Sequence, residues 1–339
     1  MSLTEPTRRS FLGAAAMLAA PACAQAQQPA PAPPSPSPFS PEPFVIGGGP
    51  VGAAYNALGA AIAKLLVRTV PGLSATSAVT KGGFDNVDRV ASGHADIGFT
   101  QVDIAVNTVE GDGYYRGRHL PVRALGVMFP NHLHLVTTSG SGIRTMEDLQ
   151  GKRVSTGGAP GSAIEDLAYR ALTIAGLDRN RDLASIVSQS LADSNAAVKA
   201  GTLDAYFFPS GIPAPAVTNL ASTPGVKLVL VDTAGLADGF IARYGPVYFS
   251  DVIPAGTYPG QDRDNLQVSV TNIIVATSAM PDARVTAILS ALWANRPELI
   301  AAHPEATHFS VAAQKTAAVG VPWHPAAAAF WKAQGAQLA

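Results

Sequence analysis

The segment Phe44-Val45-Ile46-Gly47-Gly48-Gly49-Pro50-Val51-Gly52-Ala53-Ala54-Tyr55 decides the fold of this chain. A short run of β-forming residues enters a turn with glycines at positions 47, 49 and 52, and an alanine-rich helical run follows. The spacing G-x-G-x-x-G is typical of a dinucleotide-binding turn. It is equally typical of a strand–loop–helix turn whose backbone N–H groups bind an anion. The first interpretation predicts a flavin or nicotinamide oxidoreductase, and the second a solute-binding protein.

An internal repeat favours two similar halves. The pattern V-x-x-G-G-x-x-G occupies residues 45–52 and recurs 109 positions later at 154–161. The pattern V-x-x-G-x-x-D-x-x-F occupies residues 90–99 and recurs 108 positions later at 198–207. Two patterns at nearly equal offsets predict two α/β lobes of similar structure, with ligands at the carboxyl ends of their strands.

Hydrophobic periodicity gives the same alternation of strands and helices. The fold class that we expect is α/β, with two lobes, mainly parallel sheets flanked by helices, and a cleft between the lobes. The predicted helices cover 53–67, 83–91, 162–175 and 193–200, and the predicted strands cover 73–79, 97–100, 184–188 and 205–208.

The dinucleotide interpretation lacks one necessary residue. Such a site needs an acidic side chain about 20 residues beyond the glycines, to bind the ribose. No Asp or Glu occurs between Glu42 and Asp85. We therefore expect no cofactor, and prefer capture of an anion by helix N-termini from both glycine-rich turns.

The first residues resemble an export signal. A twin-arginine motif, residues 7–12, precedes an apolar run that ends at Ala20, so residues 1–26 are expected to direct export to a bacterial periplasm and to be removed. Lipid anchoring at Cys23, the one cysteine, stays open as an alternative. Residues 27–42 are proline-rich and are expected to form a disordered tether.

The remaining chain, about 295 residues, suits two domains. We expect lobe 1 to comprise 43–136 plus 268–339 and lobe 2 to comprise 137–267, with strands 132–137 and 267–276 as hinge crossings. The 23 basic and 24 acidic residues nearly balance, which argues against nucleic acid as a partner. We expect a monomer.

The candidate ligand contacts lie near the predicted carboxyl ends of strands. Ser162 would open a helix as an N-cap and Gln101 would offer an amide, whereas Tyr55 would either contact the ligand or pack in the core. The full set is Gly48, Gly49, Val51, Tyr55, Gln101, Gly161, Ser162, Ala163, Ser210, Gly211 and Ile212.

Other polar residues are expected to have structural roles. Asp103 would cap the helix that follows Gln101, and His132 and His134 would point to one face of a strand near the hinge. His324 would be a packed surface residue. No nucleophile elbow, metal-ligand cluster or phosphate-binding lysine motif occurs, so we expect no catalytic residue and no bound metal.

Taken together, the motifs resemble the TAXI family of solute-binding proteins of TRAP transporters. The segments that carry the resemblance are 46–59, 93–103, 149–162, 204–213 and 256–261. The resemblance implies a type II periplasmic binding protein that captures a small organic anion, a dicarboxylate or a glutamate-like amino acid. It would deliver this solute to the permease subunits of a TRAP transporter in the membrane; a sensor that hands the solute to a signalling receptor is the alternative.

The first turn departs from the pattern of that family, which is Gly-Thr-Gly-Gly-Thr-Gly-Gly-Val-Tyr-Tyr. Pro50 and Val51 stand where the family has Gly-Thr, and Asn56 replaces the second Tyr. Proline removes one backbone donor, and the lost threonine removes a hydroxyl. The choice of ligand is therefore expected to be affected at this turn.

Overall fold

The computed structural model describes residues 42–338, and ten of its strands form one sheet. The predicted signal segment, Cys23 and almost all of the proline-rich tether lie outside the described residues. The sheet has the strand order β2-β1-β3-β10-β4-β7-β5-β6, with β8 paired to β4 and β9 paired to β10. In the part of the chain that is described, no helix is long and apolar enough to cross a membrane.

The strands are short except for two. They are β1 Phe44–Gly47, β2 Ala75–Ala78, β3 Ile97–Gln101, β4 Val122–Thr138, β5 Arg153–Ser155, β6 Ser185–Val187, β7 Ala205–Ser210, β8 Leu228–Val231, β9 Tyr248–Ile253 and β10 Asn265–Thr277. The helices are α1 Ala54–Thr69, α2 Gly83–Ala91, α3 Val102–Glu110, α4 Ala163–Ile174, α5 Leu191–Lys199, α6 Pro215–Ala221, α7 Ala237–Tyr244, α8 Asp282–Ala294, α9 Arg296–Ala302, α10 Thr316–Val319 and α11 Pro325–Ala333.

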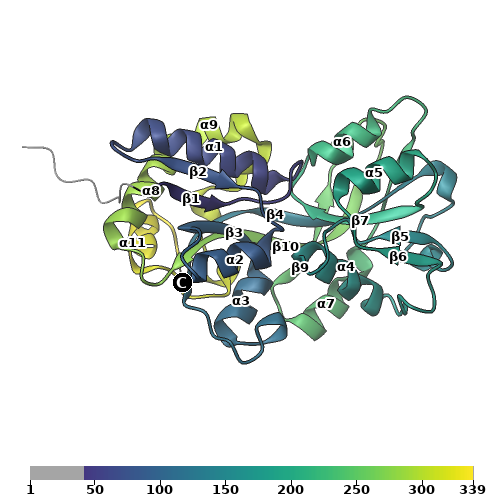
Figure 1. Ribbon diagram of the computed structural model, residues 1–339, viewed down its shortest axis with the longest axis horizontal. Helices are drawn as coiled ribbons and strands as arrows, with labels where there is room; N and C mark the ends of the chain where they lie inside the picture. The colour runs from purple at the N-terminus through teal and green to yellow at the C-terminus, as the bar shows by residue number, and fades with distance from the viewer. Residues whose placement is uncertain (1–41, 339) are drawn as a thin grey trace, which may run out of the picture. The chain divides into compact units, whose positions relative to one another are not determined.

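The internal repeat appears in the topology as two half-sheets. In the first half-sheet β1 lies between β2 and β3, and in the second β5 lies between β6 and β7, all in parallel pairs. Figure 1 shows the two groups of strands at opposite ends of the view, each with its own helices. The expected α/β fold with two lobes and flanking helices is thus confirmed.

Equivalent aspartates stabilise both half-sheets. The Oδ2 atom of Asp96 accepts the backbone N–H of Val45 at 2.7 Å, and that of Asp204 accepts the backbone N–H of Arg153 at 2.8 Å. Both carboxylates stand just before the third strand of their half-sheet and bind the start of the first. The aspartate of the repeated pattern therefore has the same structural role twice.

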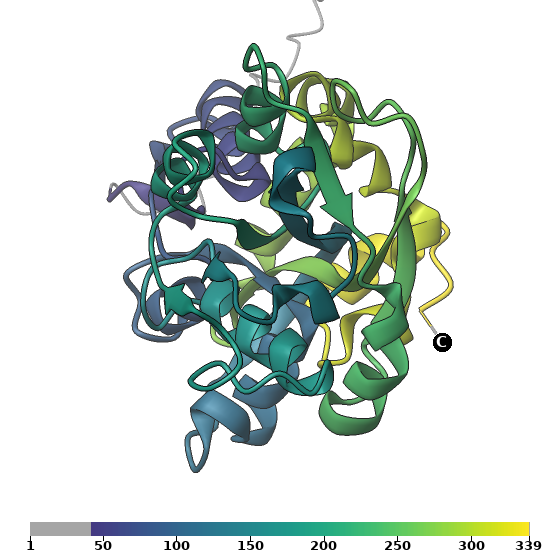
Figure 2. The same cartoon turned by 90° about the vertical axis from the view of Figure 1, so that its right-hand side faces the viewer.

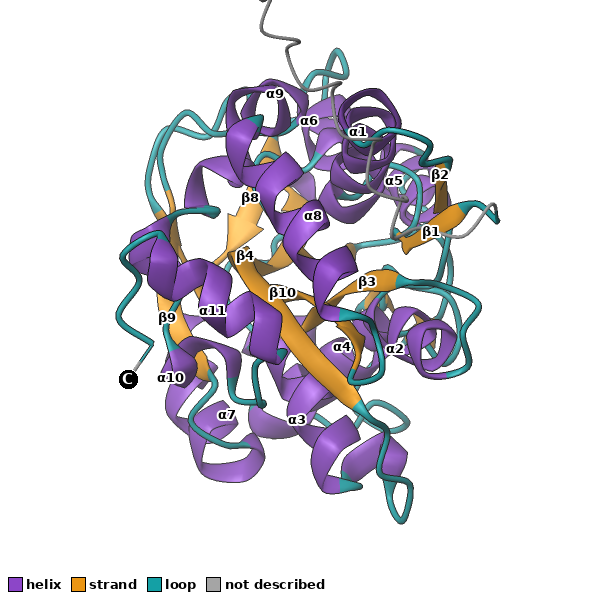
Figure 3. Ribbon diagram, turned by 90° about the vertical axis from the view of Figure 1, so that its left-hand side faces the viewer, coloured by secondary structure: helices purple, strands orange, loops and turns teal. Residues whose placement is uncertain are grey.

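The two long strands join the half-sheets. β4 and β10 pair antiparallel with each other, β10 also pairs with β3, and β4 also pairs with β7 (Figure 3). The register places His132 opposite both Ser269 of β10 and Ser210 of β7. Parallel pairing thus holds inside each half-sheet, whereas every pairing of a long strand is antiparallel. The sheet is therefore mixed and not mainly parallel as expected, because the two long strands make five antiparallel pairings against four parallel ones in the half-sheets.

Helices cover both faces of the sheet, as the views along it show (Figures 2 and 3). One apolar cluster packs α1, α8 and α11 against β1 and β3, and includes the fully buried Leu58, Phe99 and Trp331. A second cluster packs α5 and α6 against β7, and it contains Ala53 from the first glycine-rich turn. The first turn is therefore in apolar contact with the second half of the protein.

The glycines of the first turn are required by close packing. A Cβ atom on Gly47 would come within 2.7 Å of the Asn86 side chain, and one on Gly48 within 2.8 Å of the carbonyl oxygen of Ala78. Asn86 is fully buried, and its Nδ2 donates to the carbonyl oxygens of Gly48 at 2.6 Å and Phe99 at 2.7 Å. This amide thus ties the turn after β1 to β3.

We predict that Asn86→Ala lowers the free energy of unfolding by about 2–4 kcal/mol, because the buried carbonyl groups of Gly48 and Phe99 each lose a hydrogen bond from its amide. Urea titration followed by circular dichroism measures this loss. The exposed Asn180→Ala serves as the control, with a change within about 0.5 kcal/mol. Equal effects of the two substitutions would contradict the role given to Asn86.

Candidate functional site

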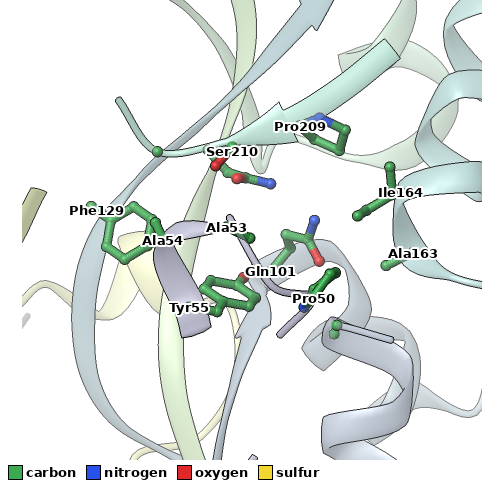
Figure 4. A pocket seen from close by; sticks show the side chains of 14 residues that line it. Pro50, Ala53, Ala54, Tyr55, Gln101, Phe129, Ala163, Ile164, Pro209 and Ser210 are labelled. Carbon is green, nitrogen blue, oxygen red and sulfur yellow. The ribbon is translucent and has the colours of Figure 1, made fainter. Parts of the chain in front are cut away.

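A cavity lies where the loops of both half-sheets meet the long strands. Its empty volume is about 350 Å³, with the open mouth included. Figure 4 shows Tyr55, Gln101 and Ser210 around the same space. The lining residues are Pro50, Ala53, Ala54, Tyr55, Gly82, Gly83, Gln101, Phe129, Asn131, Ala163, Ile164, Pro209, Ser210 and Gly211.

Four helices begin at this cavity. Ala53, Gly82 and Gln101 are the N-cap residues of α1, α2 and α3, and none of them caps its helix with a side chain. The first residues of α4, Ala163 and Ile164, line the opposite wall. The first N–H groups of a helix have no partners within it and carry its partial positive charge. The helix ends therefore direct partial positive charge at a cavity whose lining has no basic side chain.

Two buried polar side chains in the lining have atoms without a hydrogen bond partner. They are Oε1 of Gln101, whose residue is 5% exposed, and Oγ of Ser210, whose residue is 4% exposed. Buried polar groups are nearly always paired, so both are available to a polar solute. The Gln101 amide offers either its oxygen or its nitrogen after rotation. A side chain at Gly83 would collide with this amide, since its Cβ would lie 2.7 Å from Oε1.

No charged side chain lines the cavity among the described residues. Tyr55 closes one side: its hydroxyl donates to Oδ1 of Asn272, and its ring stacks on Phe99 with centroids 5.1 Å apart. Ala53, Ala54, Phe129 and Pro209 add apolar wall. A small solute would thus meet backbone N–H groups, two neutral polar side chains and carbon.

The structure brings five of the predicted ligand contacts to the cavity: Tyr55, Gln101, Ala163, Ser210 and Gly211. The other six lie around it. Gly48 and Gly49 pack against neighbouring residues of the first half-sheet and its helix α1, and Val51 is 72% exposed and lies outside the cavity lining. The N–H of Ile212 donates to Glu305. Gly161 and Ser162 belong to the cap of α4. Whether any of the eleven binds a ligand stays a prediction.

Ser162 is the N-cap that the sequence predicts, since its Oγ accepts the N–H of Glu165 at 3.2 Å. The Glu165 carboxylate in turn accepts the N–H of Gly161 at 2.6 Å. One acceptor hydroxyl and one negative charge therefore already satisfy the beginning of α4. The N-cap residues of α1, α2 and α3 make no such bond with their own side chains. Before α2, however, the Asp85 carboxylate accepts the N–H of Lys81 at 3.0 Å, as Glu165 does for Gly161.

The expectation that Asp103 caps α3 was wrong. Its Oδ2 accepts from Arg170 of α4 at 3.0 Å and from the Tyr248 hydroxyl at 2.6 Å. Burial lowers the pKa of Arg170, but the charges of Asp103, Tyr248 and Asp166 outweigh burial and raise it, so the guanidinium is always protonated. This buried pair joins α3 and α4, which both begin at the cavity. Asp103 lies in the first turn of α3, and Arg170 lies about two turns into α4.

A second buried group supports the loop after β7. Glu305, 2% exposed in the 3₁₀ turn Pro304–His308, accepts the N–H of Ile212. Burial raises the pKa of Glu305 to about 8, although the bond from Ile212 lowers it and the charge of Asp251 raises it further. The exposed ring of His308 lies 3.5 Å from its other oxygen. The protonated carboxyl is therefore a substantial form at neutral pH.

The histidines have structural contacts. The Nε2 atom of His134 lies 2.8 Å from the Tyr258 hydroxyl, and burial lowers the pKa of His134 to about 3. The Nε2 atom of His132 lies 3.3 Å from Asp251. His324 is 1% exposed and caps α11, so the surface position expected for it was wrong. Within residues 42–338 no group of side chains has the arrangement of a metal site.

Several lining residues were not foreseen. Asn131 and Phe129 come from β4, and Gly82 and Gly83 from the start of α2. The glycine pair before a predicted helix at 83 repeats the signal of the first turn and could have indicated Gly82 and Gly83. Nothing local marks Phe129 and Asn131, because their place depends on how β4 pairs with its neighbours.

A comparison with known protein families assigns the chain to one of them. The NMT1-like family matches residues 46–335, so the chain belongs to that family, which is of the periplasmic solute-binding type.

Similar solved structures include two aliphatic sulphonate-binding proteins named SsuA. The periplasmic one from Escherichia coli is 18% identical, with 86% of this chain and 84% of that chain covered and a TM-score of 0.45. The one from Xanthomonas axonopodis pv. citri, bound to MOPS, is 18% identical, with 87% and 84% covered and a TM-score of 0.45.

The GluR0 ligand-binding core from Nostoc punctiforme, in complex with L-glutamate, is 13% identical, with 78% and 98% covered and a TM-score of 0.45. Similarities of this size carry no argument about what the present chain binds.

We predict that Arg170→Met lowers the free energy of unfolding by about 3–5 kcal/mol, because Asp103 is then a buried charge without its cation. Arg181→Met is the control: this guanidinium is 73% exposed, and its loss should cost less than about 1 kcal/mol. Urea titration measures both. Adding Asp103→Asn to Arg170→Met should recover part of the loss, and a further loss instead would contradict the pairing.

The raised pKa of the buried Glu305 carboxyl predicts that the stability of the protein depends on pH. Because its folded pKa, about 8, exceeds the ordinary value of 4.5, its stabilising contribution is complete below about pH 4.5 and is lost as the pH rises through about 8. We expect the free energy of unfolding of the wild type to fall over this window relative to Glu305→Gln. Urea titrations at a series of pH values measure the difference, and a constant difference would contradict the assignment.

Proposed function

We propose that this protein captures a small organic anion in the cavity and delivers it to the permease subunits of a TRAP transporter in the membrane. The observation that carries the proposal is the convergence of four helix N-termini on one cavity that also holds two buried, unpartnered polar atoms. Helix N-termini bind carboxylates and other oxyanions through backbone N–H groups. A cation would face their partial positive charges with no acidic side chain in the lining.

Gln101 and Ser210 would be the side chains that orient the anion. Each is the last residue of a strand: Gln101 ends β3 in the first half-sheet, and Ser210 ends β7 in the second. Each can donate a hydrogen bond to an oxyanion. Bonds to a charged acceptor contribute about 1.5–3 kcal/mol each, which is enough for a selective site of this size.

The location of Gln101 and Ser210 in different half-sheets supports closure of two lobes on the solute. We propose the limits 43–136 plus 268–339 for lobe 1 and 137–267 for lobe 2, so that β4 and β10 contain the crossings. A solute that contacts Gln101 and Ser210 together favours the closed arrangement, because only that arrangement offers both. The solute, not a covalent step, would drive the change.

The delivery route rests on the sequence. The TAXI resemblance supports a TRAP permease as the partner, and the twin-arginine signal supports the periplasm as the compartment. The same site fits an extracytoplasmic sensor, for which a receptor would replace the permease as the partner. The oxidoreductase interpretation loses its main argument, because the three glycines of the motif are explained without a nucleotide: Gly47 packs against Asn86, Gly49 packs against Tyr55, and Gly52 has a positive φ of 86°.

We predict that calorimetric titration of the mature protein with small organic acids, including dicarboxylates and acidic amino acids, detects binding. Gln101→Leu should weaken that binding by about tenfold to a hundredfold, since a bond to a charged group is lost. The exposed Gln150→Leu is the matched control and should bind like the wild type. Thermal unfolding without solute checks that both variants fold. Failure of every acid to bind, or equal binding by the two variants, would refute the proposal.

A further inference from the structure

A second hollow continues the cavity outward. It has an empty volume of about 710 Å³, and Pro50 and Ile164 line both hollows. The residues that line it come after the carboxyl ends of β1, β2, β5 and β6 and include Val51, Val79, Lys81, Gly157 and Leu191. We call it the outer groove. It lies in the same cleft as the cavity, farther from the long strands.

The outer groove is apolar. Val51 and Val79 are 72% and 60% exposed, the two largest exposures among the large hydrophobic side chains of the described residues. Single exposed valines need no explanation, but two that line one groove together with Leu191 and Ile164 form an apolar surface. Such a surface within a ligand cleft indicates contact with carbon.

The polar side chains of the outer groove are mostly occupied. The hydroxyl of Thr80 donates to the carbonyl oxygen of Gly48 at 2.9 Å, and that of Ser190 donates to Asp193 at 2.6 Å. Lys81 is the one charged residue in its lining, and it is exposed. The helix α5 begins at the groove, but Ser190 caps it. The groove therefore contrasts with the cavity in having no unpartnered buried polar atom among its lining residues.

Resting on the proposed function, we propose that the solute is an acid with one charged end and one apolar end. Its carboxylate or equivalent oxyanion lies in the cavity near Gln101 and Ser210. Its carbon chain or ring passes between Pro50 and Ile164 and contacts Val51 and Val79 in the outer groove. The proposal narrows the class of solute from organic acids in general to amphipathic monoanions. It differs in this from the dicarboxylate or acidic amino acid that the sequence suggested.

The physical argument is the cost of desolvation. A second carboxylate on the solute would leave water for a groove lined mainly by aliphatic side chains, where the exposed ammonium of Lys81 is the one charged partner and no lining residue has an unpartnered buried polar atom. An apolar chain in the same place gains free energy with each methylene that it buries. Pro50 keeps its ring at the junction because proline fixes the backbone angle φ, and its carbonyl oxygen accepts the N–H of Ala53 at 3.1 Å.

Calorimetry of the mature protein with straight-chain monocarboxylates, from acetate to octanoate, tests this inference. We expect the affinity to rise by about fourfold per methylene once the chain reaches the outer groove. The corresponding dicarboxylates and glutamate should bind more weakly than the monocarboxylates of equal length.

The double variant Val51→Thr, Val79→Thr should reduce the gain per methylene without changing the fold, because both side chains are exposed. Val67→Thr, at a half-exposed position of α1 outside both hollows, is the matched control and should keep the full gain.

The outcomes separate this inference from the proposed function. Tight binding of a dicarboxylate or glutamate, with no dependence on chain length among monocarboxylates, would overturn the inference and leave anion capture in place. A chain-length dependence that the double variant and Val67→Thr retain equally would also overturn it, since the apolar contact would then lie elsewhere. Failure of every acid to bind would refute the proposed function itself.

Discussion

The first backbone N–H groups of an α-helix find no partner within the helix, and this constraint organises the protein. Parallel strands followed by helices bring helix N-termini to the carboxyl edge of a sheet. Here two half-sheets point their carboxyl edges at one cavity, so that α1, α2, α3 and α4 all begin there. Three of these helices have no side-chain cap. The anion preference that we propose for the site would therefore come from the backbone, without a basic side chain in the lining.

The ionisable side chains near the site have partners within the protein. Arg170 is bound by Asp103 and Asp166, and Glu305 binds the N–H of Ile212. These groups hold elements in place and add no free charge to the cavity lining. Neutral polar atoms and helix ends distinguish solutes by shape and hydrogen bonding as well as by charge, because no single strong ion pair dominates the interaction.

Much of this could be predicted from local patterns. The repeated motifs gave the two half-sheets, and helix α2 begins and ends at the predicted residues, 83 and 91. Other features depend on distant partners that one sequence does not reveal. Asp103 stands at the start of a helix, where a cap is the natural expectation, but Arg170 lies 67 residues away. Phe129 and Asn131 enter the cavity only through the antiparallel pairing of β4 with β7 and β10. The periodicity of a strand gives its buried face but not its neighbours.

The two glycine-rich turns have the same topology but different chemistry. The second turn satisfies its own helix: Ser162 caps α4, and Glu165 places a carboxylate against the N–H of Gly161. The first turn has Ala53 at the equivalent position and offers no side-chain acceptor to α1. The helices α2 and α3, also of the first half-sheet, are likewise uncapped. An oxyanion bound as we propose would therefore find most of its hydrogen bonds in the first half, and the second half would contribute Ser210 and the wall of Ala163.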